Sequence, residues 1–198
     1  EWAGGAMSGR SAEQSAGDGL GLDRREVRLS PHNPDWVTLG AQECAAVAAL
    51  LGQLAVAVVH VGSTAVPGLE AKPILDIAAA VRDQVPIDDV VSRLCEKGSY
   101  AYDGDRRDDG GLLFVRGEGT FRTVHVHVVG QGSRAWEDYL RFHALLRDDP
   151  DARDAYQTAK RQLARTFARD RPGYTKAKGI VVEELLGSDD HSPPPHPD

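Results

Sequence analysis

The sequence predicts an α+β (α/β-like) domain in which a small mixed β-sheet is flanked by helices and followed by a C-terminal helical segment. Two apolar runs of strand length, residues 54–61 and 73–81, enclose a Gly-Ser turn and a Pro-Gly turn. Residues 122–129 alternate between apolar and polar side chains, as a half-buried strand does. From residue 133 onward the pattern becomes helical. With 198 residues, 41% of them hydrophobic, the chain is long enough for one ordinary globular core.

The two ends of the chain lack the apolar periodicity of its middle. Residues 1–25 are rich in Gly, Ala, Ser and charge, and residues 188–198 contain four prolines in a polar run. Such segments cannot bury enough apolar surface to fold. We therefore expect a disordered N-terminal arm, one domain over residues 26–187 and a disordered proline-rich tail, and we expect that both ends can be deleted with little loss of stability.

The first half of the domain predicts strands and helices in alternation. Residues 27–29 predict a short edge strand, and residues 35–52 predict a helix capped by Asn33 or Asp35. Apolar side chains recur at helical spacing along this helix, so it packs on the core. After the two apolar strands, residues 86–97 predict another helix, because a proline stands early in it and two aspartates lie in its first turn.

The second half predicts a hairpin, a strand and three helices. Residues 99–102 and 112–115 read as two strands joined by an acidic, glycine-rich loop over 103–111. In the alternating strand 122–129, the valines at even positions face the core and the polar side chains face away from it. Prolines and glycines divide the remaining helical pattern into segments at 133–148, 150–170 and 172–187.

Composition excludes several classes of partner. The formal net charge of −7 argues against binding to a nucleic-acid polymer, although a local basic patch could still receive a small phosphorylated ligand. No stretch reaches the length of a membrane span and the N-terminus lacks a signal-peptide pattern, so we expect a cytoplasmic protein without a membrane partner. Cys44 and Cys95 lie in apolar helical patterns without metal-type spacing, which favours buried free thiols. The oligomeric state does not follow from the sequence.

A single carboxylate stands inside the second apolar run. Asp76 occupies the middle of Ile-Leu-Asp-Ile, and the turn of Gly62 and Ser63 ends the preceding strand. A carboxylate is costly to bury unless a cation or hydrogen-bond donors meet it, so its position predicts a functional site. Glycine lets a backbone approach a ligand closely and the serine hydroxyl can donate a hydrogen bond to an anion, although Gly-Ser is also simply a turn.

Two histidines on the alternating strand are candidate metal ligands. The spacing of His125 and His127 places both rings on one side of the strand, about 7 Å apart at their Cα atoms. Two imidazoles so placed can share a metal ion. They can equally line a polar groove, with one of them hydrogen-bonded to Asp76. His60, just before the Gly-Ser turn, is a weaker metal candidate and could equally be a satisfied core histidine.

One phrase of this sequence resembles a known family. The run HVGSTAVPGLEAKPILDI at residues 60–77 resembles the signature of the GrpB-like family in the nucleotidyltransferase superfamily, some of whose members form the C-terminal part of dephospho-coenzyme A kinases. The resemblance continues through PHNPDW at 31–36 and VHVHVV at 124–129, and it covers about residues 27–186. His32 departs from it, since the family usually has tyrosine there.

The resemblance implies roles for the site residues. In the superfamily a Gly-Ser turn approaches the phosphates of a nucleoside triphosphate, so Gly62, Ser63 and the adjoining Thr64 are expected to contact phosphate. The superfamily also pairs acids at alternate strand positions to chelate magnesium, but here Ala78 stands in the second position and histidines stand where the third acid is expected. The resemblance therefore implies a site with one carboxylate and two imidazoles. Such a site suits an imidazole-binding divalent ion better than magnesium, unless the polymerase-like chemistry has been lost.

Basic and aromatic side chains complete the candidate site. Lys72 lies on the loop that must cover the Gly-Ser turn, and Tyr174 and Lys178 share one helical face, from which they could reach a nucleotide's base or phosphate. For three further basic residues, a solvated surface position is the better expectation than an anion contact: Arg122, Arg141 and Lys160.

These observations support three functional hypotheses. By resemblance, the first is metal-dependent nucleotide binding, or nucleotidyl transfer to an unknown acceptor, by a nucleotidyltransferase-like domain. The second is a noncatalytic ligand-binding or folding-helper domain, related to the appendage of dephospho-coenzyme A kinases. The third is a metalloenzyme that has kept the fold without nucleotide chemistry, which an imidazole-rich site would suit.

Overall fold

A five-stranded mixed sheet forms the centre of the fold, as the sequence predicts. The computed structural model describes residues 19–106 and 111–188. The strands that begin at Leu75 and at Val124 run parallel to each other, and every other pair of neighbours in this sheet is antiparallel. The strands lie in the order β2 (Ala55–Val61), β3 (Leu75–Val81), β7 (Val124–Gly130), β5 (Gly111–Arg116) and β4 (Ala101–Arg106).

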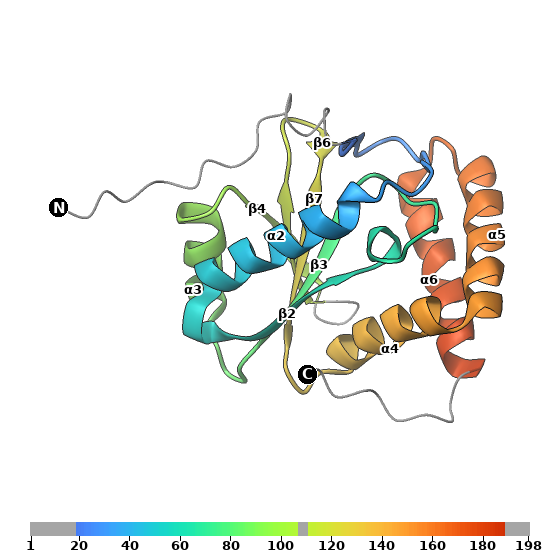
Figure 1. Cartoon of the computed structure of the whole chain (residues 1–198). Coiled ribbons are helices and arrows are strands. Elements are labelled where there is room, and N and C mark those ends of the chain that lie inside the picture. Colours follow the sequence, from blue (N-terminus) through green and yellow to red (C-terminus); the bar gives the residue numbers. More distant parts are fainter. Residues whose placement is uncertain (1–18, 107–110, 189–198) are drawn as a thin grey trace.

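Helices cover both faces of this sheet, so the domain is of the mixed α+β class (Figure 1). One face packs against α2 (Asp35–Leu51), α3 (Ile87–Val91) and the π-helical turn η3 (Ser92–Glu96). The other face packs against α4 (Arg134–Asp148), and α5 (Pro150–Thr166) and α6 (Arg171–Ser188) lie beyond α4. The expected C-terminal helical segment is therefore present.

Alternation along β3 and β7 divides their side chains between these two faces of the sheet. In β3, Leu75 and Ile77 join the core under α2, whereas Ala78 joins the smaller core under α4. In β7, Val124 and Val126 are fully buried on the α2 side. The polar residues of both strands consequently point toward α4 and the C-terminal helices.

Local signals explain where the C-terminal helices begin. The Ser133 hydroxyl accepts a hydrogen bond from the backbone N–H of Trp136, at 3.2 Å, and thereby caps α4. The Asp149 carboxylate caps α5 in the same way, and Pro150 occupies the first turn, where its missing N–H is not needed. α5 ends at Thr166, four residues before the expected end, where a short turn leads into α6.

The N-terminal boundary of the domain lies earlier than expected. Residues 27–29 form no edge strand; instead β1 (Leu22–Asp23) pairs with β6 (Phe121–Arg122). Leu20 and Leu22 are buried in the structure, and Leu22 is fully so. The expectation that residues 19–25 belong to a disordered arm is therefore wrong. The rest of that arm, residues 1–18, and residues 189–198 of the expected tail lie outside the described residues.

Two further elements differ from the sequence-based expectation. The strand β4 runs on to Arg106, into the segment expected to be a solvated loop, and it pairs with β5 with a bulge at residues 102–104. The helix expected at 86–97 divides into α3 and the π-helical η3. Both cysteines are free, as expected, but they are half-buried where buried thiols were expected.

Helix α2 also has the length and composition of a membrane span, where no such stretch was expected. The 20-residue segment Asp35–Leu54 passes that test by length and composition alone, as the core helices of soluble proteins also do. In this fold Trp36, Val47 and Leu51 on α2 are buried in the core beneath the sheet. The helix therefore packs on the core through this stripe, while other apolar side chains of α2, such as Val37, are exposed.

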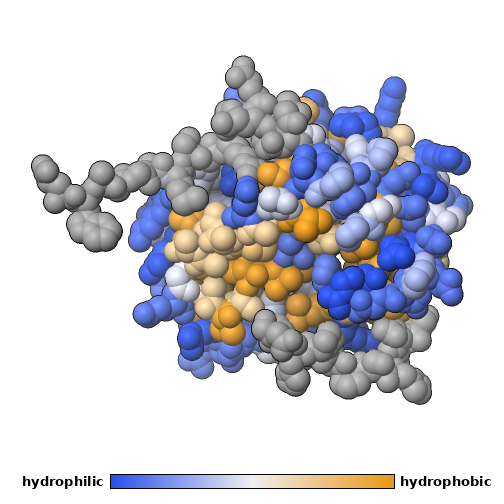
Figure 2. All heavy atoms as spheres, in the orientation of Figure 1, coloured by the Kyte–Doolittle hydropathy of each residue, from blue (hydrophilic) through white to orange (hydrophobic). Residues whose placement is uncertain are grey.

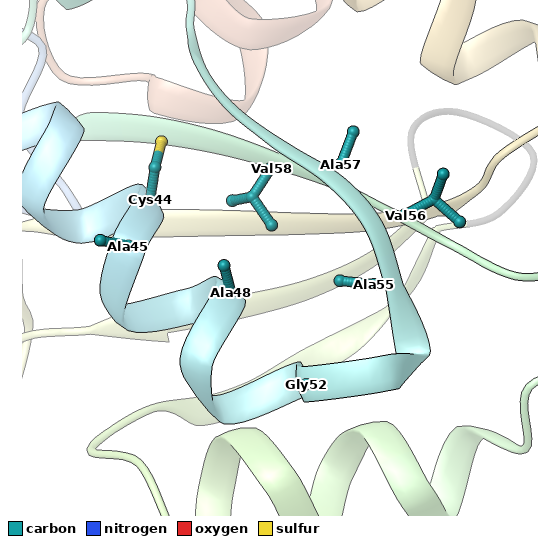
Figure 3. A pocket seen from close by; sticks show the side chains of 8 residues that line it. All are labelled: Cys44, Ala45, Ala48, Gly52, Ala55, Val56, Ala57 and Val58. Atoms are coloured by element: carbon teal, nitrogen blue, oxygen red, sulfur yellow. The ribbon is translucent and has the colours of Figure 1, made fainter.

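An apolar surface lies where α2 meets the edge strand β2. Figure 2 shows weakly and strongly apolar side chains gathered on this side of the molecule, and Val37 and Val56 are 44% and 52% exposed. A shallow hollow of about 330 Å³ lies within it, lined by alanines, valines and Cys44 (Figure 3). It adjoins residues 55–58 of β2, whereas Asp76 lies beside Val61 at the other end of that strand. The hollow therefore lies apart from the polar site described below.

Candidate functional site

The parallel pairing of β3 and β7 brings the three principal candidates together. Asp76 is the second residue of β3 and pairs in register with His125, the second residue of β7. His127 pairs with Ala78, two positions further along. Because residues two apart in a strand share a face, all three polar side chains project from one face of the sheet at the start of the two strands.

The separations within this triad fit a metal ion. Asp76 Oδ1 lies 3.2 Å from His125 Nδ1 and 3.7 Å from His127 Nε2. One ligand atom from each residue can be chosen so that all three lie within 4.8 Å of one another. Ligand atoms about 2.1 Å from a tetrahedral ion lie about 3.4 Å apart, so these separations need little adjustment to close on one ion. Three protein ligands leave one position for water or substrate, as in catalytic rather than structural zinc sites.

The triad is partly enclosed and its charges are coupled. The side chains of His125, His127 and Asp76 are 18%, 22% and 34% exposed. Burial raises the pKa of Asp76, but hydrogen bonds and charge from the two histidines more than offset this and hold it well below its usual range. Burial lowers the pKa of His125, against the opposing effect of Asp76. Metal ligation needs an ionised carboxylate, which the low pKa of Asp76 favours, and a neutral imidazole, which the lowered pKa of His125 favours.

The Gly-Ser turn lies directly against this carboxylate. Gly62 has a φ of +74°, and a Cβ at this position would lie 3.0 Å from Asp76 Oδ2. Only glycine combines that backbone conformation with so close an approach. The turn then continues into η2 (Ser63–Ala65), where the buried Thr64 hydroxyl lies 2.9 Å from His60 Nε2. Gly62 thus lies against the Asp76 carboxylate, and Thr64 contacts a protein side chain; phosphate contact by this turn stays a prediction.

His60 does not belong to the metal site. It pairs with Ile77, whose side chain lies in the α2 core, and antiparallel partners project from the same face of a sheet. A Cβ added to Gly40 of α2 would lie 2.0 Å from His60 Nδ1, so the ring packs against that helix. Burial, together with repulsion from His143 and His32, lowers its pKa to about 4. His60 therefore lies on the opposite face of the sheet from the triad, half-buried and in hydrogen-bond contact with Thr64, which agrees with the alternative of a satisfied histidine.

Lys160 is a site residue that sequence reasoning placed on the solvated surface. It is 2% exposed, and its Nζ donates hydrogen bonds to Ser63 Oγ at 2.9 Å and to the backbone carbonyl of Glu70. Its Nζ also lies 4.8 Å from the centre of the Tyr156 ring. Burial lowers the pKa of Lys160 to about 7, with a further contribution from Lys178. The signal that could have found it is the spacing of Tyr156 and Lys160, one helical turn apart, which repeats that of the expected pair on α6.

The other expected ligand contacts lie beside it. Lys72 is half-buried with its Nζ 5.0 Å from the centre of the Tyr174 ring, and Tyr174 itself is 1% exposed. Burial lowers the pKa of Lys72 to about 7, and Lys178 and Arg171 lower it further. Lys178 is half-buried, and the neighbouring tyrosine Tyr156 raises its pKa. The loop and α6 therefore bring these expected residues to the same region as Lys160.

Helix α4 closes the remaining side of the triad. The ring centres of His127 and Tyr139 lie 5.3 Å apart. Burial, with a contribution from the charge of Asp76, raises the pKa of the Tyr139 phenol. The other two basic residues expected at the surface bind backbone carbonyls: Arg122 donates to Gly119 at 2.7 Å and Arg141 to Leu186 at 3.1 Å. Both contacts hold loops or helix ends, away from the role of anion receptor.

Comparison with known proteins places this architecture in one family. The chain is 38% identical over 162 residues to a UPF0157 protein of Streptomyces coelicolor, which covers 82% of this chain and 83% of the relative. It is 28% identical over 180 residues to a protein of Mycolicibacterium paratuberculosis named dephospho-CoA kinase, covering 79% of this chain and 44% of that protein. The crystal structure of conserved protein GrpB from Enterococcus faecalis matches with a TM-score of 0.70 and 28% identity, over 83% of this chain and 100% of that one. The family model described as GrpB protein matches residues 26–188, so the chain belongs to the GrpB family.

Proposed function

We propose that this GrpB-family chain is a metal-dependent protein that acts on a nucleotide or a related small phosphorylated ligand, by nucleotidyl transfer to an acceptor. The observation on which this proposal rests is the triad of Asp76, His125 and His127, whose ligand atoms lie within 4.8 Å of one another. Its donor set of one carboxylate and two imidazoles favours zinc, iron, manganese or nickel over magnesium. A bound divalent ion supplies positive charge that stabilises negative charge on a phosphoryl oxygen.

The surrounding residues supply the remaining requirements of such chemistry. The Gly62 backbone lies against Asp76 without a side chain, so no Cβ presses on the carboxylate. Lys72 and Lys178 bring positive charge that can compensate phosphate oxygens. The Tyr139 ring of α4 lies against the His127 ring, with ring centres 5.3 Å apart, and covers part of one side of the triad. Support for a phosphorylated ligand comes from the resemblance to nucleotidyltransferases and from a relative named dephospho-CoA kinase.

Binding without transfer is the second candidate. Ala78 stands where a second carboxylate would be needed to hold two magnesium ions in the manner of the superfamily, and it is fully buried. A site with only one carboxylate cannot reproduce that two-ion arrangement. A ligand-binding domain, or a metalloenzyme with different chemistry, would keep the metal affinity and lack nucleotidyl transfer.

Metal titration of the purified, metal-free chain tests the proposal. We expect zinc, manganese and nickel to bind more tightly than magnesium, and Asp76→Ala and His125→Ala to lose this binding while keeping the fold. Because ligation needs neutral imidazole, binding should weaken as the pH falls below about 6.5. Asp148→Ala and His143→Ala are matched controls on α4 and should bind as the unchanged protein does.

Calorimetry and nucleotide turnover separate the outcomes. Release of pyrophosphate from a nucleoside triphosphate, dependent on the metal and lost in Asp76→Ala, would establish transfer. Metal binding without pyrophosphate release would favour the second candidate. If magnesium bound as tightly as zinc, without pH dependence and without any effect of His125→Ala, the histidines would be structural and the proposal would fail.

A further inference from the structure

Three lysines converge beside the triad from segments far apart in the sequence. Lys72 comes from the loop before β3, Lys160 from α5 and Lys178 from α6. Each of them lies close enough to the others, or to Asp76, for their charges to alter one another's protonation. The aromatic rings of Tyr156 and Tyr174 lie against Lys160 and Lys72, respectively. This group of side chains forms a lysine cluster on the C-terminal helix side of the metal triad.

Among the residues that the structure describes, the lysine cluster has carboxylates nearby but no direct ion-pair partner. Across the described ranges 19–106 and 111–188, none of the three ammonium groups forms an ion pair with a carboxylate. The Glu70 carboxylate accepts hydrogen bonds from Nε and Nη2 of Arg161, at 2.9 Å each. Lys160 contacts only the backbone carbonyl of Glu70. Asp76 is engaged by the two histidines. Cations withdrawn from water without a partner are costly, so the cluster is complementary to an anion from outside the chain.

The shape of the cluster indicates which anion fits. The ammonium groups come from a loop and two helices, and the Ser63 hydroxyl, which accepts from Lys160, retains its own proton for donation. A tetrahedral dianion with several acceptor oxygens matches such an arrangement, whereas a planar carboxylate has one charge and two oxygens. We propose that Lys72, Lys160, Lys178 and Ser63 form an anion subsite that binds a phosphoryl group of the ligand, beside the metal triad and independent of it. The proposal rests on the proposed function for the nature of the ligand, of which this group would be one part.

Protonation provides a signature that a purely structural role would not. Without an anion, burial lowers the pKa of Lys72 and of Lys160 to about 7, so both are mainly neutral above that pH. A bound dianion restores their charged forms, and binding at about pH 8.5 should therefore take up about one proton or more. The titratable and charged groups that act on the two lysines come from every adjoining element: Glu70, Asp76, Tyr156, Arg171, Tyr174 and Lys178.

The test uses the full-length chain, freed of metal by a chelator, and inorganic phosphate as the probe. Calorimetry at about pH 8.5, in buffers of different ionisation enthalpy, measures both affinity and proton uptake. We expect phosphate to bind without metal, and Lys160→Met to weaken binding by about tenfold or more and to reduce proton uptake. Lys178→Met is a second variant in a half-buried position, should Lys160→Met fail to fold. Lys176→Met removes an exposed lysine from the same helix and should change neither quantity.

The outcomes distinguish this inference from the function on which it rests. Phosphate binding that depends on Lys160 and Lys178, in a protein that binds no metal, would support the subsite and overturn the metal proposal. Metal binding at the triad with no phosphate binding would do the reverse. Phosphate binding equal in all variants, or without proton uptake, would show that the lysines serve only to hold α5 and α6 on the domain, and the inference would be wrong.

Discussion

Replacing Lys160 by methionine should change the pH dependence of stability. Methionine keeps an unbranched side chain of similar length and removes the charge that burial disfavours. The pKa of Lys160 falls from 10.5 to about 7 on folding, so the folded state holds fewer protons than the unfolded state between these values. Stability of the unliganded protein therefore rises with pH through this window, and the variant lacks that contribution.

The expected size follows from these two pKa values. At pH 6 the lysine is charged in both states and burial costs the folded protein on the order of 5 kcal/mol; at pH 9 the cost has fallen to about 2 kcal/mol. The stability of Lys160→Met relative to the unchanged protein should thus be about 3 kcal/mol more favourable at pH 6 than at pH 9. The hydrogen bonds lost to Ser63 and Glu70 lower stability at both pH values, so the comparison between them isolates the buried charge.

Denaturant unfolding of both proteins at the two pH values, in phosphate-free buffer, measures this difference. Lys176→Met serves as the control, because its side chain is exposed on the same helix as Lys178. An equal stability change at pH 6 and pH 9 for Lys160→Met would mean that the lysine keeps an ordinary pKa in the folded state. The case for a cluster that needs an external anion would then lose its electrostatic basis.

Three further changes probe the site and its scaffold. Gly62→Ala should weaken metal binding without removing a ligand, because its Cβ would press on Asp76 at a positive φ; a titration equal to that of the unchanged chain would contradict this. Leu22→Ala should lower the free energy of unfolding by about 2–5 kcal/mol, as for other fully buried leucines, and thermal unfolding with no shift would show that this segment does not pack. Arg116→Met should cost about 3–5 kcal/mol in denaturant unfolding, since it leaves the buried Glu43 carboxylate without its ion pair, and a cost below about 1 kcal/mol would refute this.

The parts of the site that lie on strands could be predicted from the sequence. The alternation around His125 and His127 fixes their shared face locally, and the apolar neighbours of Asp76 mark it as an exception within its strand. Their meeting depends on the parallel pairing of two strands 49 residues apart, which the family resemblance supplied and periodicity alone could not. The face of His60 could not be predicted for a related reason, since it is set by the register of β2 against β3.

The parts that lie on helices and loops depended on tertiary packing. An isolated helical pattern in α5 shows Lys160 on a polar stripe, and only the docking of α5 over the Gly-Ser turn buries it. Leu22 was missed because two strand residues in a glycine-rich, charged segment give no periodic signal; its burial comes from pairing with β6, about 100 residues later. Local propensity does not predict the burial of a side chain that is buried by a segment distant in the sequence.

The hydrogen bond between Lys160 and Ser63 joins residues 97 positions apart, about twice the separation that the His125–Asp76 contact spans. Closing the longer loop costs more chain entropy, and it requires α5 to have formed and docked. During synthesis the sheet and its triad can therefore assemble before the last two helices leave the ribosome, whereas the lysine cluster cannot. A ligand that contacts both the triad and the lysine cluster would link local unfolding of α5 and α6 to local unfolding of the sheet. The amide hydrogens of the helices and of the sheet would then exchange with solvent together.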